Sequence, residues 1–272
     1  MSKRILITGT SGFLGGALGK HLRSCGHHVT GISRRKSREE SVDFHVTHDL
    51  TNPLPNNLGK FDVLFHAAAL SSPWASPKDF YRNIEQASQN IVDYVRKNKI
   101  PRLINISSTS VHYIMADQYD ISEETPFPKK AINQYAESKL AAENLILKNV
   151  TDALSVRPRA IYGPGDTVLL PRLLRAARNG MLPQIIRSDG LSPRSDLIYI
   201  GNLVNILEAA IDKNLSGVIN VTDNNTVNTD ELLSDIFKRL NYRKPRFNLS
   251  VNTAMKLAKT AEFLSKTLAG WK

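Results

Sequence analysis

A glycine-rich segment near the start of the chain constrains the fold more than any other feature. Residues 3–8 are apolar and partly β-branched, which is typical of a buried strand, and Thr-Gly-Thr-Ser-Gly-Phe-Leu-Gly follows at positions 8–15. Helical spacing of Ala17, Leu18 and Leu22 comes next. A strand, a glycine-rich turn and a helix in this order form a dinucleotide-binding fingerprint. The segment therefore predicts an α/β fold with a Rossmann-type, doubly wound parallel sheet.

The glycines of this segment have separate physical roles. Gly9 allows a tight turn, Gly12 lets the backbone approach a pyrophosphate, and Gly15 allows the helix to pack closely on the strand. The N-terminus of the helix adds N–H groups and positive potential for phosphate oxygens. The residues of this segment that we expect to bind the cofactor are Gly9, Ser11, Gly12, Phe13, Leu14 and Gly15.

The end of the second predicted strand, residues 28–32, indicates which dinucleotide is bound. Proteins that prefer NAD usually carry an acidic residue here, which holds the ribose 2′-hydroxyl. This chain has Ser33 followed by Arg34 and Arg35, and arginine binds a phosphate group through two parallel hydrogen bonds. The sequence therefore predicts NADP as the cofactor. NAD is the alternative if these arginines only form a basic surface loop.

Two more predicted strands, residues 42–46 and 61–65, end in residues that suit a flat cofactor. An acid just past the first strand can accept a hydrogen bond from an adenine amino group, and three alanines after the second let a flat group lie against the backbone. The residues concerned are Asp49, Leu50, Ala67, Ala68 and Ala69. We interpret His66 as a packed structural residue rather than a catalytic one, because histidine is moderately buried in general.

A run of hydroxyl side chains follows the buried strand predicted at residues 102–106. Open α/β sheets bind ligands at the carboxyl ends of their strands, so the run at 107–110 predicts a reactive edge. Further on, Tyr135 and Lys139 are spaced to share one face of a helix that continues through Ile146. A phenol is a poor acid or base near neutral pH, and we expect the Lys139 ammonium to lower the pKa of Tyr135.

The chain divides into a cofactor-binding part and a later, less regular part. We expect residues 1–165 to form the dinucleotide-binding domain with the catalytic residues. Residues 166–272 are expected to form mainly a small substrate-binding lobe, interleaved with the end of the sheet. The remaining predicted elements are helices at 77–99, 169–180, 202–213 and from Thr229, and strands at 153–157, 197–200 and 218–221.

Several motifs occur together, in the order Thr8-Gly9-x-x-Gly12-x-x-Gly15, Asp49-Leu50, His66-Ala67-Ala68, Ser107-Ser108, Tyr135-x-x-x-Lys139 and Arg157-Pro158-x-x-x-Tyr162-Gly163-Pro164-Gly165. In this order they resemble an extended short-chain dehydrogenase/reductase of the NAD-dependent epimerase/dehydratase family. The resemblance runs from Lys3 to about Glu231. Within the superfamily, residues 157–171 are most similar to the 3-beta-hydroxysteroid dehydrogenase-like branch.

The resemblance implies a role for each catalytic candidate. Tyr135 would be the general acid/base, and Lys139 would bind the nicotinamide ribose hydroxyls and lower the pKa of Tyr135. Ser108 would hydrogen-bond the substrate carbonyl oxygen, with Ser107 and Thr109 as alternatives. The resemblance also implies that four residues contact the cofactor: Tyr135, Lys139, Pro158 and Ile161.

The same resemblance implies an NADP-dependent oxidoreductase that interconverts a ketone and a secondary alcohol. The substrate would be lipophilic, steroid-like or of the 3-oxo/3-hydroxy type. A nucleotide-sugar epimerase or dehydratase is the first alternative, but many such relatives carry Arg-Asp where this chain has Ser195-Asp196. A non-catalytic protein that senses NADP is the second alternative, and such relatives tend to lose the Tyr135–Lys139 pair.

Composition argues against several other classes of protein. The net charge is +11, but neither zinc-ligand spacing nor a nucleic-acid motif accompanies it. We therefore expect a small-molecule substrate, no metal and no nucleic acid. Cys25 is the single cysteine and is expected to be a small packing residue at a helix end, which suits a reducing cytoplasm. No apolar run reaches the roughly 18 residues of a membrane-spanning helix.

An apolar stripe at three- and four-residue steps predicts a helix near the C-terminus. The stripe consists of Val251, Ala254, Met255, Ala258, Ala261, Leu264, Leu268 and Trp271. We expect this helix to pack on the substrate lobe. The alternative is a helix that lies on an anionic membrane surface, because several lysines lie off the stripe. Whether the protein forms a homodimer is left open.

Overall fold

The structure is a computed structural model that describes residues 1–71, 75–167, 170–179, 182–242 and 248–268. The chain forms two compact units. The first unit contains residues 1–165 and 198–223, and the second contains residues 166–197 and 224–272. The chain therefore leaves the first unit after Gly165 and returns to it at Ile198.

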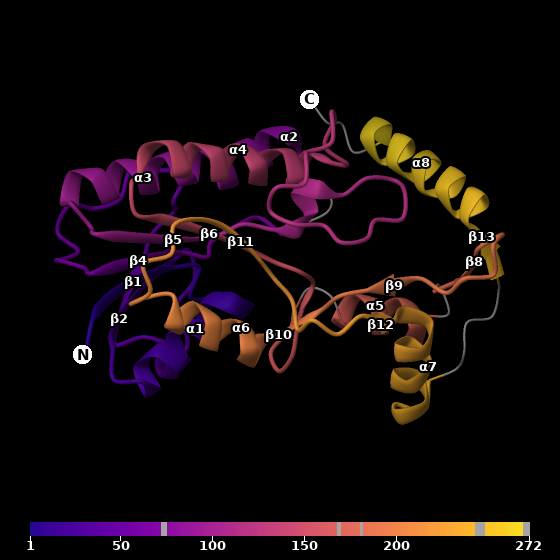
Figure 1. The fold of residues 1–272 in the computed structure, drawn as a ribbon, viewed down its shortest axis with the longest axis horizontal. Helices are drawn as coiled ribbons and strands as arrows, with labels where there is room; N and C mark the ends of the chain where they lie inside the picture. The colour runs from indigo at the N-terminus through magenta and orange to yellow at the C-terminus, as the bar shows by residue number, and fades with distance from the viewer. Residues whose placement is uncertain (72–74, 168–169, 180–181, 243–247, 269–272) are drawn as a thin grey trace. The chain divides into compact units, whose positions relative to one another are not determined.

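The first unit is built on a sheet of seven parallel strands in the order β11-β6-β5-β4-β1-β2-β3 (Figure 1). The strands are β1 (Arg4–Thr8), β2 (His28–Ser33), β3 (Phe44–Thr47), β4 (Val63–His66), β5 (Arg102–Ile106), β6 (Ala153–Pro158) and β11 (Gly217–Val221). β4, β5 and β6 are buried along their whole length, as strands of a parallel sheet are when helices cover both faces. The predicted Rossmann-type fold is confirmed.

Helices cover both faces of this sheet (Figure 1). α1 (Phe13–Ser24) and α6 (Ile200–Ala209) lie on one face and share a hydrophobic core with β1 and β6. α3 (Ala87–Asn98) and α4 (Gln134–Asn149) lie on the other face and contact each other. The predicted helix at 77–99 consists of α2 (Pro77–Phe80), a π-helical turn η2 (Tyr81–Gln86) and α3.

Shorter elements complete both units. The first unit adds η1 (Glu39–Ser41), η3 (Thr109–His112), β7 (Ile161–Tyr162) and β10 (Ile198–Tyr199). The second unit contains α5 (Leu170–Arg178), β8 (Gln184–Ile186), β9 (Arg194–Ser195), β12 (Val227–Asn228), α7 (Thr229–Arg239), β13 (Asn248–Ser250) and α8 (Val251–Leu268). In the second unit β9 pairs with β12 and β8 pairs with β13.

The structure corrects some sequence-based boundaries. The strand predicted at 197–200 contains only Ile198 and Tyr199, and Ile200 already begins α6. Short apolar runs fit a strand or a helix equally well, so periodicity cannot separate them. Cys25 caps the C-terminus of α1 and is exposed, so its predicted packing role is wrong.

Some predictions fall on parts of the chain that the structure does not describe. These are Leu169 and Gly180 at the ends of a predicted helix, Trp271 of the C-terminal stripe, and the side chains of Ala261, Leu264 and Leu268. Among the residues that are described, no helix combines the length and the apolar character needed to cross a membrane.

Candidate active site

The glycine-rich turn between β1 and α1 packs directly against the chain that follows β4. Gly9 has a φ of +79°, and a Cβ placed on it would lie 2.9 Å from backbone atoms of Ala68. A Cβ on Gly15 would lie 2.4 Å from the Gly9 carbonyl oxygen. Ala67 is half-buried and Ala69 is exposed. Only glycine fits these two positions, because any larger residue would occupy the space between the turn and its neighbours.

The N-terminus of α1 presents unsatisfied backbone groups at this turn. Gly12 is the N-cap, no side chain caps the helix, and its first turn carries no acidic residue. Ser11 and Phe13 are half-buried, whereas Leu14 is buried in a core against which Ile161 also packs. The first N–H groups of a helix need partners, and an anion satisfies them. The residues present therefore fit the pyrophosphate of a dinucleotide.

The basic segment after β2 combines a buried serine with exposed arginines. The Ser33 hydroxyl donates a hydrogen bond to the Arg35 carbonyl oxygen at 2.8 Å and lies 3.5 Å from the Thr10 hydroxyl. Arg34 and Arg35 are exposed, and Arg34 donates to the side-chain oxygen of Asn83 at 3.4 Å. Ser33 therefore fixes the backbone of this segment through its hydrogen bond to Arg35. The charged groups of Arg34 and Arg35 are exposed to solvent.

Asp49 and Leu50, just past β3, have different surroundings. The Asp49 carboxylate accepts a hydrogen bond from the Thr51 backbone N–H at 3.0 Å, and this bond lowers the pKa of Asp49. Leu50 is buried in the core under α3, and its carbonyl oxygen accepts a hydrogen bond from Asn90 at 2.8 Å. The Asp49 carboxylate is therefore a charged hydrogen-bond acceptor just past the end of β3, whereas Leu50 packs in the core.

His66 is a buried structural residue, as predicted. Its Nδ1 lies 2.9 Å from the Thr8 hydroxyl and its Nε2 lies 3.2 Å from the Ser88 hydroxyl. Burial, together with the charge of Lys139, lowers the pKa of His66 to about 3. The ring is therefore neutral at physiological pH and ties β4 to β1 and α3.

The three predicted catalytic residues meet at the carboxyl end of the sheet. Tyr135 and Lys139 lie on α4, and Ser108 follows β5. The Ser108 hydroxyl lies close enough to the Tyr135 phenol to act on its pKa, which it lowers. The Lys139 ammonium donates to the Ile106 carbonyl oxygen at 2.6 Å, and burial lowers the pKa of Lys139 to about 8.

The expected effect of Lys139 on Tyr135 is wrong for this structure. Burial raises the pKa of Tyr135, and the nearby Ser108 hydroxyl lowers it by a smaller amount. The Lys139 ammonium bonds to the backbone of Ile106 rather than to the phenol. The phenol therefore stays protonated near neutral pH, which suits a proton donor.

Ser108 differs from the other two candidate hydroxyls in its contacts. The Ser107 side chain is buried, and its oxygen has no hydrogen-bond partner among the described residues. The Thr109 hydroxyl lies 3.1 Å from the Tyr113 hydroxyl and donates to the Pro158 carbonyl oxygen at 3.5 Å. Of the three, Ser108 is the one that acts on the pKa of Tyr135, which favours it as the second catalytic hydroxyl.

Sequence reasoning missed a buried ion pair behind the catalytic helix. Arg157 of β6 donates to both carboxylate oxygens of Glu143 on α4, at 2.9 and 2.5 Å. Another nitrogen of Arg157 donates to His112 Nε2 at 2.9 Å. Glu143 lies one helical turn after Lys139, and His112 ends the short helix that follows Ser108. The ion pair therefore joins the two segments that carry the catalytic groups to β6.

The fold and this site place the protein in the class of dinucleotide-binding α/β proteins. Over residues 5–222 the chain matches the NAD dependent epimerase/dehydratase family. The protein belongs to this family, which confirms the family that the motifs indicated.

Curated relatives include reductases and dehydrogenases. The chain is 31% identical over 210 residues to the 2-alkyl-3-oxoalkanoate reductase of Shewanella oneidensis, which covers 72% of this chain and 54% of that protein. It is 28% identical to the human sterol-4-alpha-carboxylate 3-dehydrogenase (decarboxylating), over 91% of this chain and 69% of the human protein. A second 2-alkyl-3-oxoalkanoate reductase, from Stenotrophomonas maltophilia, is matched over 62% of its length. The chain thus spans little more than half the length of these two reductases.

Similar solved structures include complexes with nucleotide sugars or NAD. MoeE5 in complex with UDP-glucose and NAD has a TM-score of 0.77 and 26% identity, covering 92% of this chain and 86% of that chain. WbmH of Bordetella bronchiseptica in complex with NAD+ has a TM-score of 0.78 at 19% identity, covering 92% and 87% of the two chains. The second likeness shows a common fold.

Proposed function

We propose that the protein is an NADP-dependent oxidoreductase that interconverts a ketone and a secondary alcohol on a lipophilic substrate, steroid-like or of the 3-oxo/3-hydroxy type. The convergence of Tyr135 and Lys139 of α4 with Ser108 after β5, where Lys139 donates to the Ile106 carbonyl oxygen at the end of β5, carries this proposal. The names of the oxoalkanoate reductase and the sterol dehydrogenase support a lipophilic oxo or hydroxy substrate.

Each catalytic side chain has one task in this proposal. The Ser108 hydroxyl donates a hydrogen bond to the substrate carbonyl oxygen, and the Tyr135 phenol donates a proton to the same atom. Lys139 holds the ribose hydroxyls. When bound, the nicotinamide supplies the hydride. Because burial raises the pKa of Tyr135, the phenol carries the proton that reduction needs.

We assign cofactor binding to the glycine-rich turn between β1 and α1, to Asp49 and to the basic segment at the end of β2. The backbone of the turn and the N-terminus of α1 hold the pyrophosphate, and Asp49 accepts from the adenine amino group. Arg34 and Arg35 bind the 2′-phosphate that distinguishes NADP from NAD, because both guanidinium groups are exposed beside the end of β2.

The second unit is assigned to substrate binding, and α8 within it is the segment considered for membrane contact. Val251 and Leu257 on α8 are 41% and 55% exposed. If α8 lies on an anionic surface, the protein should sediment with anionic vesicles at low salt and not at high salt, and deletion of residues 251–272 should abolish this binding. Equal sedimentation with neutral and anionic vesicles, or none, contradicts the membrane assignment.

A nucleotide-sugar epimerase or dehydratase is the second candidate, which the likeness to MoeE5 favours. One panel separates the two. The protein is incubated with a 2-alkyl-3-oxo acid or a 3-oxosteroid, each with NADPH or NADH, and separately with UDP-glucose and NAD+ or NADP+, the oxidised forms that must accept a hydride from the sugar. Loss of reduced-cofactor absorbance and chromatography of the sugar nucleotide are both followed, with Tyr135→Phe as the inactive control.

The proposed function predicts ketone-dependent oxidation of NADPH that Tyr135→Phe abolishes. Conversion of UDP-glucose without any ketone reduction supports the epimerase or dehydratase instead. Tight binding of NADP with no turnover across such a panel supports a non-catalytic sensor.

A further inference from the structure

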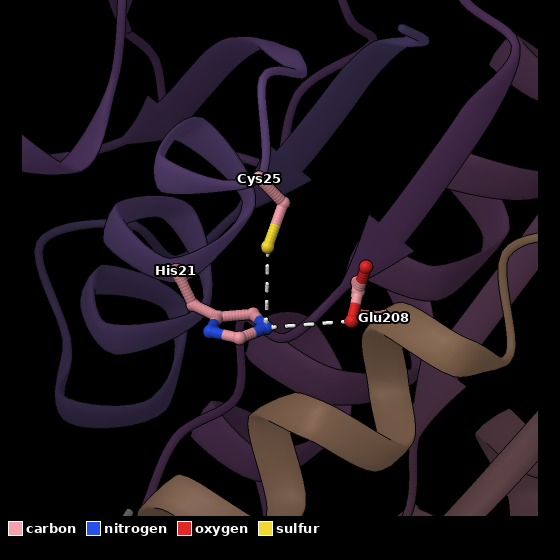
Figure 2. A group of neighbouring side chains, drawn as sticks. All are labelled: His21, Cys25 and Glu208. Atoms are coloured by element: carbon pink, nitrogen blue, oxygen red, sulfur yellow. Dashed lines mark hydrogen bonds and ion pairs between the residues drawn. The ribbon is translucent and has the colours of Figure 1, made fainter. Parts of the chain in front are cut away.

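A histidine, a cysteine and a carboxylate meet where α1 and α6 pack together. His21 lies in the last turn of α1, and Cys25 is the C-cap of the same helix. The four-residue spacing places both side chains on one side of α1. Glu208 lies on α6, which contacts α1. Figure 2 shows the sulfur of Cys25 and the carboxylate of Glu208 both directed at the same ring nitrogen of His21.

Two of the separations between these atoms are those of ligands around a tetrahedral ion. The Nε2 of His21 lies 3.7 Å from the Cys25 sulfur and 3.7 Å from a Glu208 carboxylate oxygen. All three ligand atoms lie within 4.8 Å of one another. Tetrahedral zinc, with bonds of about 2.0–2.3 Å, separates its ligand atoms by roughly 3.3–3.7 Å. An ion therefore fits between these atoms after small side-chain rotations.

We propose that His21, Cys25 and Glu208 bind a divalent transition-metal ion of the zinc type, with water as the fourth ligand. Imidazole, thiolate and carboxylate are the ligand types that zinc takes. Cys25 is exposed and the other two side chains are half-buried, so an ion from solvent reaches the site. Asp212 adds negative charge nearby, although the Lys3 ammonium lies 3.5 Å from it.

Such an ion would connect the C-terminus of α1 to α6. Ligands that bind the folded state alone stabilise it, so metal binding should raise the thermal stability of the protein. The other end of α1 forms the glycine turn, but this proposal does not depend on the proposed enzyme function. Sequence spacing could not indicate the site, because Glu208 is far from the other two ligands along the chain.

The test is titration of the full-length, reduced protein with Co²⁺, followed by displacement with Zn²⁺. Cobalt bound to a thiolate gives a charge-transfer absorption band in the near ultraviolet. Because Cys25 is the single cysteine of the chain, this band reports on Cys25 alone. We expect the band in the unmodified protein, its loss on addition of Zn²⁺, and its absence in Cys25→Ser.

Two further variants separate a built site from an isolated thiol. His21→Gln and Glu208→Gln should each weaken Co²⁺ binding at least about tenfold, since even partners outside the metal's direct ligands change affinity by this much. They should also remove any rise in Tm with Zn²⁺. His28→Gln, which removes an exposed histidine, is the matched control and should bind as the unmodified protein does. Absence of the band in the unmodified protein, or unchanged Co²⁺ affinity in both His21→Gln and Glu208→Gln, would overturn the proposal.

Discussion

The Tyr135 phenol depends on its immediate neighbours for both position and protonation. Its ring packs edge-to-face on Phe80, with centroids 6.1 Å apart, and the Ser108 hydroxyl acts on its pKa. The apolar contact favours the neutral form of the half-buried phenol, while the nearby Ser108 hydroxyl lowers its pKa by a smaller amount. Phe80 is the last residue of α2 and the N-cap of η2, so the phenol packs where the π-helical turn begins.

Replacement of Tyr135 by phenylalanine should reduce catalytic turnover without changing the folded structure. Tyr135→Phe keeps the ring and its contact with Phe80, so Tm and cofactor binding should not change. Turnover on the true substrate should fall by at least about 10²-fold, the usual contribution of an acid/base group. The matched control is Tyr94→Phe, which removes a buried hydroxyl with no partner among the described residues. Full activity in Tyr135→Phe would mean that another group donates the proton.

Arg34 should control the choice between NADP and NAD. We expect NADP(H) to bind more tightly than NAD(H) by about 1.5–3 kcal/mol, the contribution of a hydrogen bond to a charged group. Arg34→Ala should reduce this preference, whereas Lys20→Ala, which removes an exposed charge on α1, should not. Dissociation constants for both cofactors are measured at one salt concentration. Equal affinities in the unmodified protein would contradict the assignment.

Residue spacing could predict the hydroxyl run at 107–110 and the Tyr135–Lys139 pair as parts of one site, because open α/β sheets bind ligands where strands end and a helical step of four puts two side chains on one face. The choice of Ser108 within that run comes from the family resemblance. Spacing could not predict that burial dominates the pKa of Tyr135, because burial depends on Phe80 from another helix. Nor could it predict the Glu143–Arg157 pair, whose members lie on a helix and a strand that meet only in the folded chain.

At the scale of elements, α4 is attached to the sheet by charge as well as by packing. Arg157 and Glu143 are 2% and 1% exposed, so neither charge is solvated by water. A buried charge without its partner is strongly unfavourable, and Arg157 of the intact pair also donates to His112 Nε2. The position of Tyr135 and Lys139 relative to the sheet therefore depends on this ion pair.

Removal of one charge of this pair should destabilise the protein. Glu143→Gln leaves the Arg157 guanidinium buried without a counter-charge and should lower the free energy of unfolding by about 3–5 kcal/mol. Glu137→Gln changes an exposed glutamate on the same helix and should change it by less than about 0.5 kcal/mol. Urea denaturation measures both. Equal stability of the two variants would show that the pair contributes little.

Long elements could be predicted from sequence, whereas very short ones could not. The strands of the central sheet and α1, α3 and α4 carry enough apolar residues for their period to be visible. β7, β9, β10 and β12 have two residues each, which is too few to show alternation. Each of these strands forms because a paired strand supplies its hydrogen bonds. Which strand becomes the partner depends on the whole fold and not on the sequence of the short segment.

At the scale of the whole molecule, His66 makes stability depend on acidity. The folded-state pKa is about 3, against an ordinary value of 6.5. Below pH 6.5 the unfolded chain binds a proton that the folded chain does not, so stability falls as the pH falls toward 3. The slope from this residue approaches about 1.4 kcal/mol per pH unit.

Urea denaturation between pH 7.5 and pH 5 checks this expectation. His66→Gln should show a shallower loss of stability with falling pH than the unmodified protein, whatever its absolute stability. His28→Gln, at an exposed position, should retain the original slope. A slope that is the same in all three proteins would mean that other groups dominate the acid response.

The discontinuity of the first unit has a consequence for biosynthesis. β11 pairs with β6 from Gly217 to Val221, yet residues 166–197 of the second unit are translated between the two strands. Until α6 leaves the ribosome, part of the core around α1 is uncovered, and until β11 follows it, β6 is an edge strand of the sheet. Exposed edges and apolar faces on nascent chains promote aggregation and attract chaperones. The vulnerable period of this nascent chain therefore extends until translation has passed Val221.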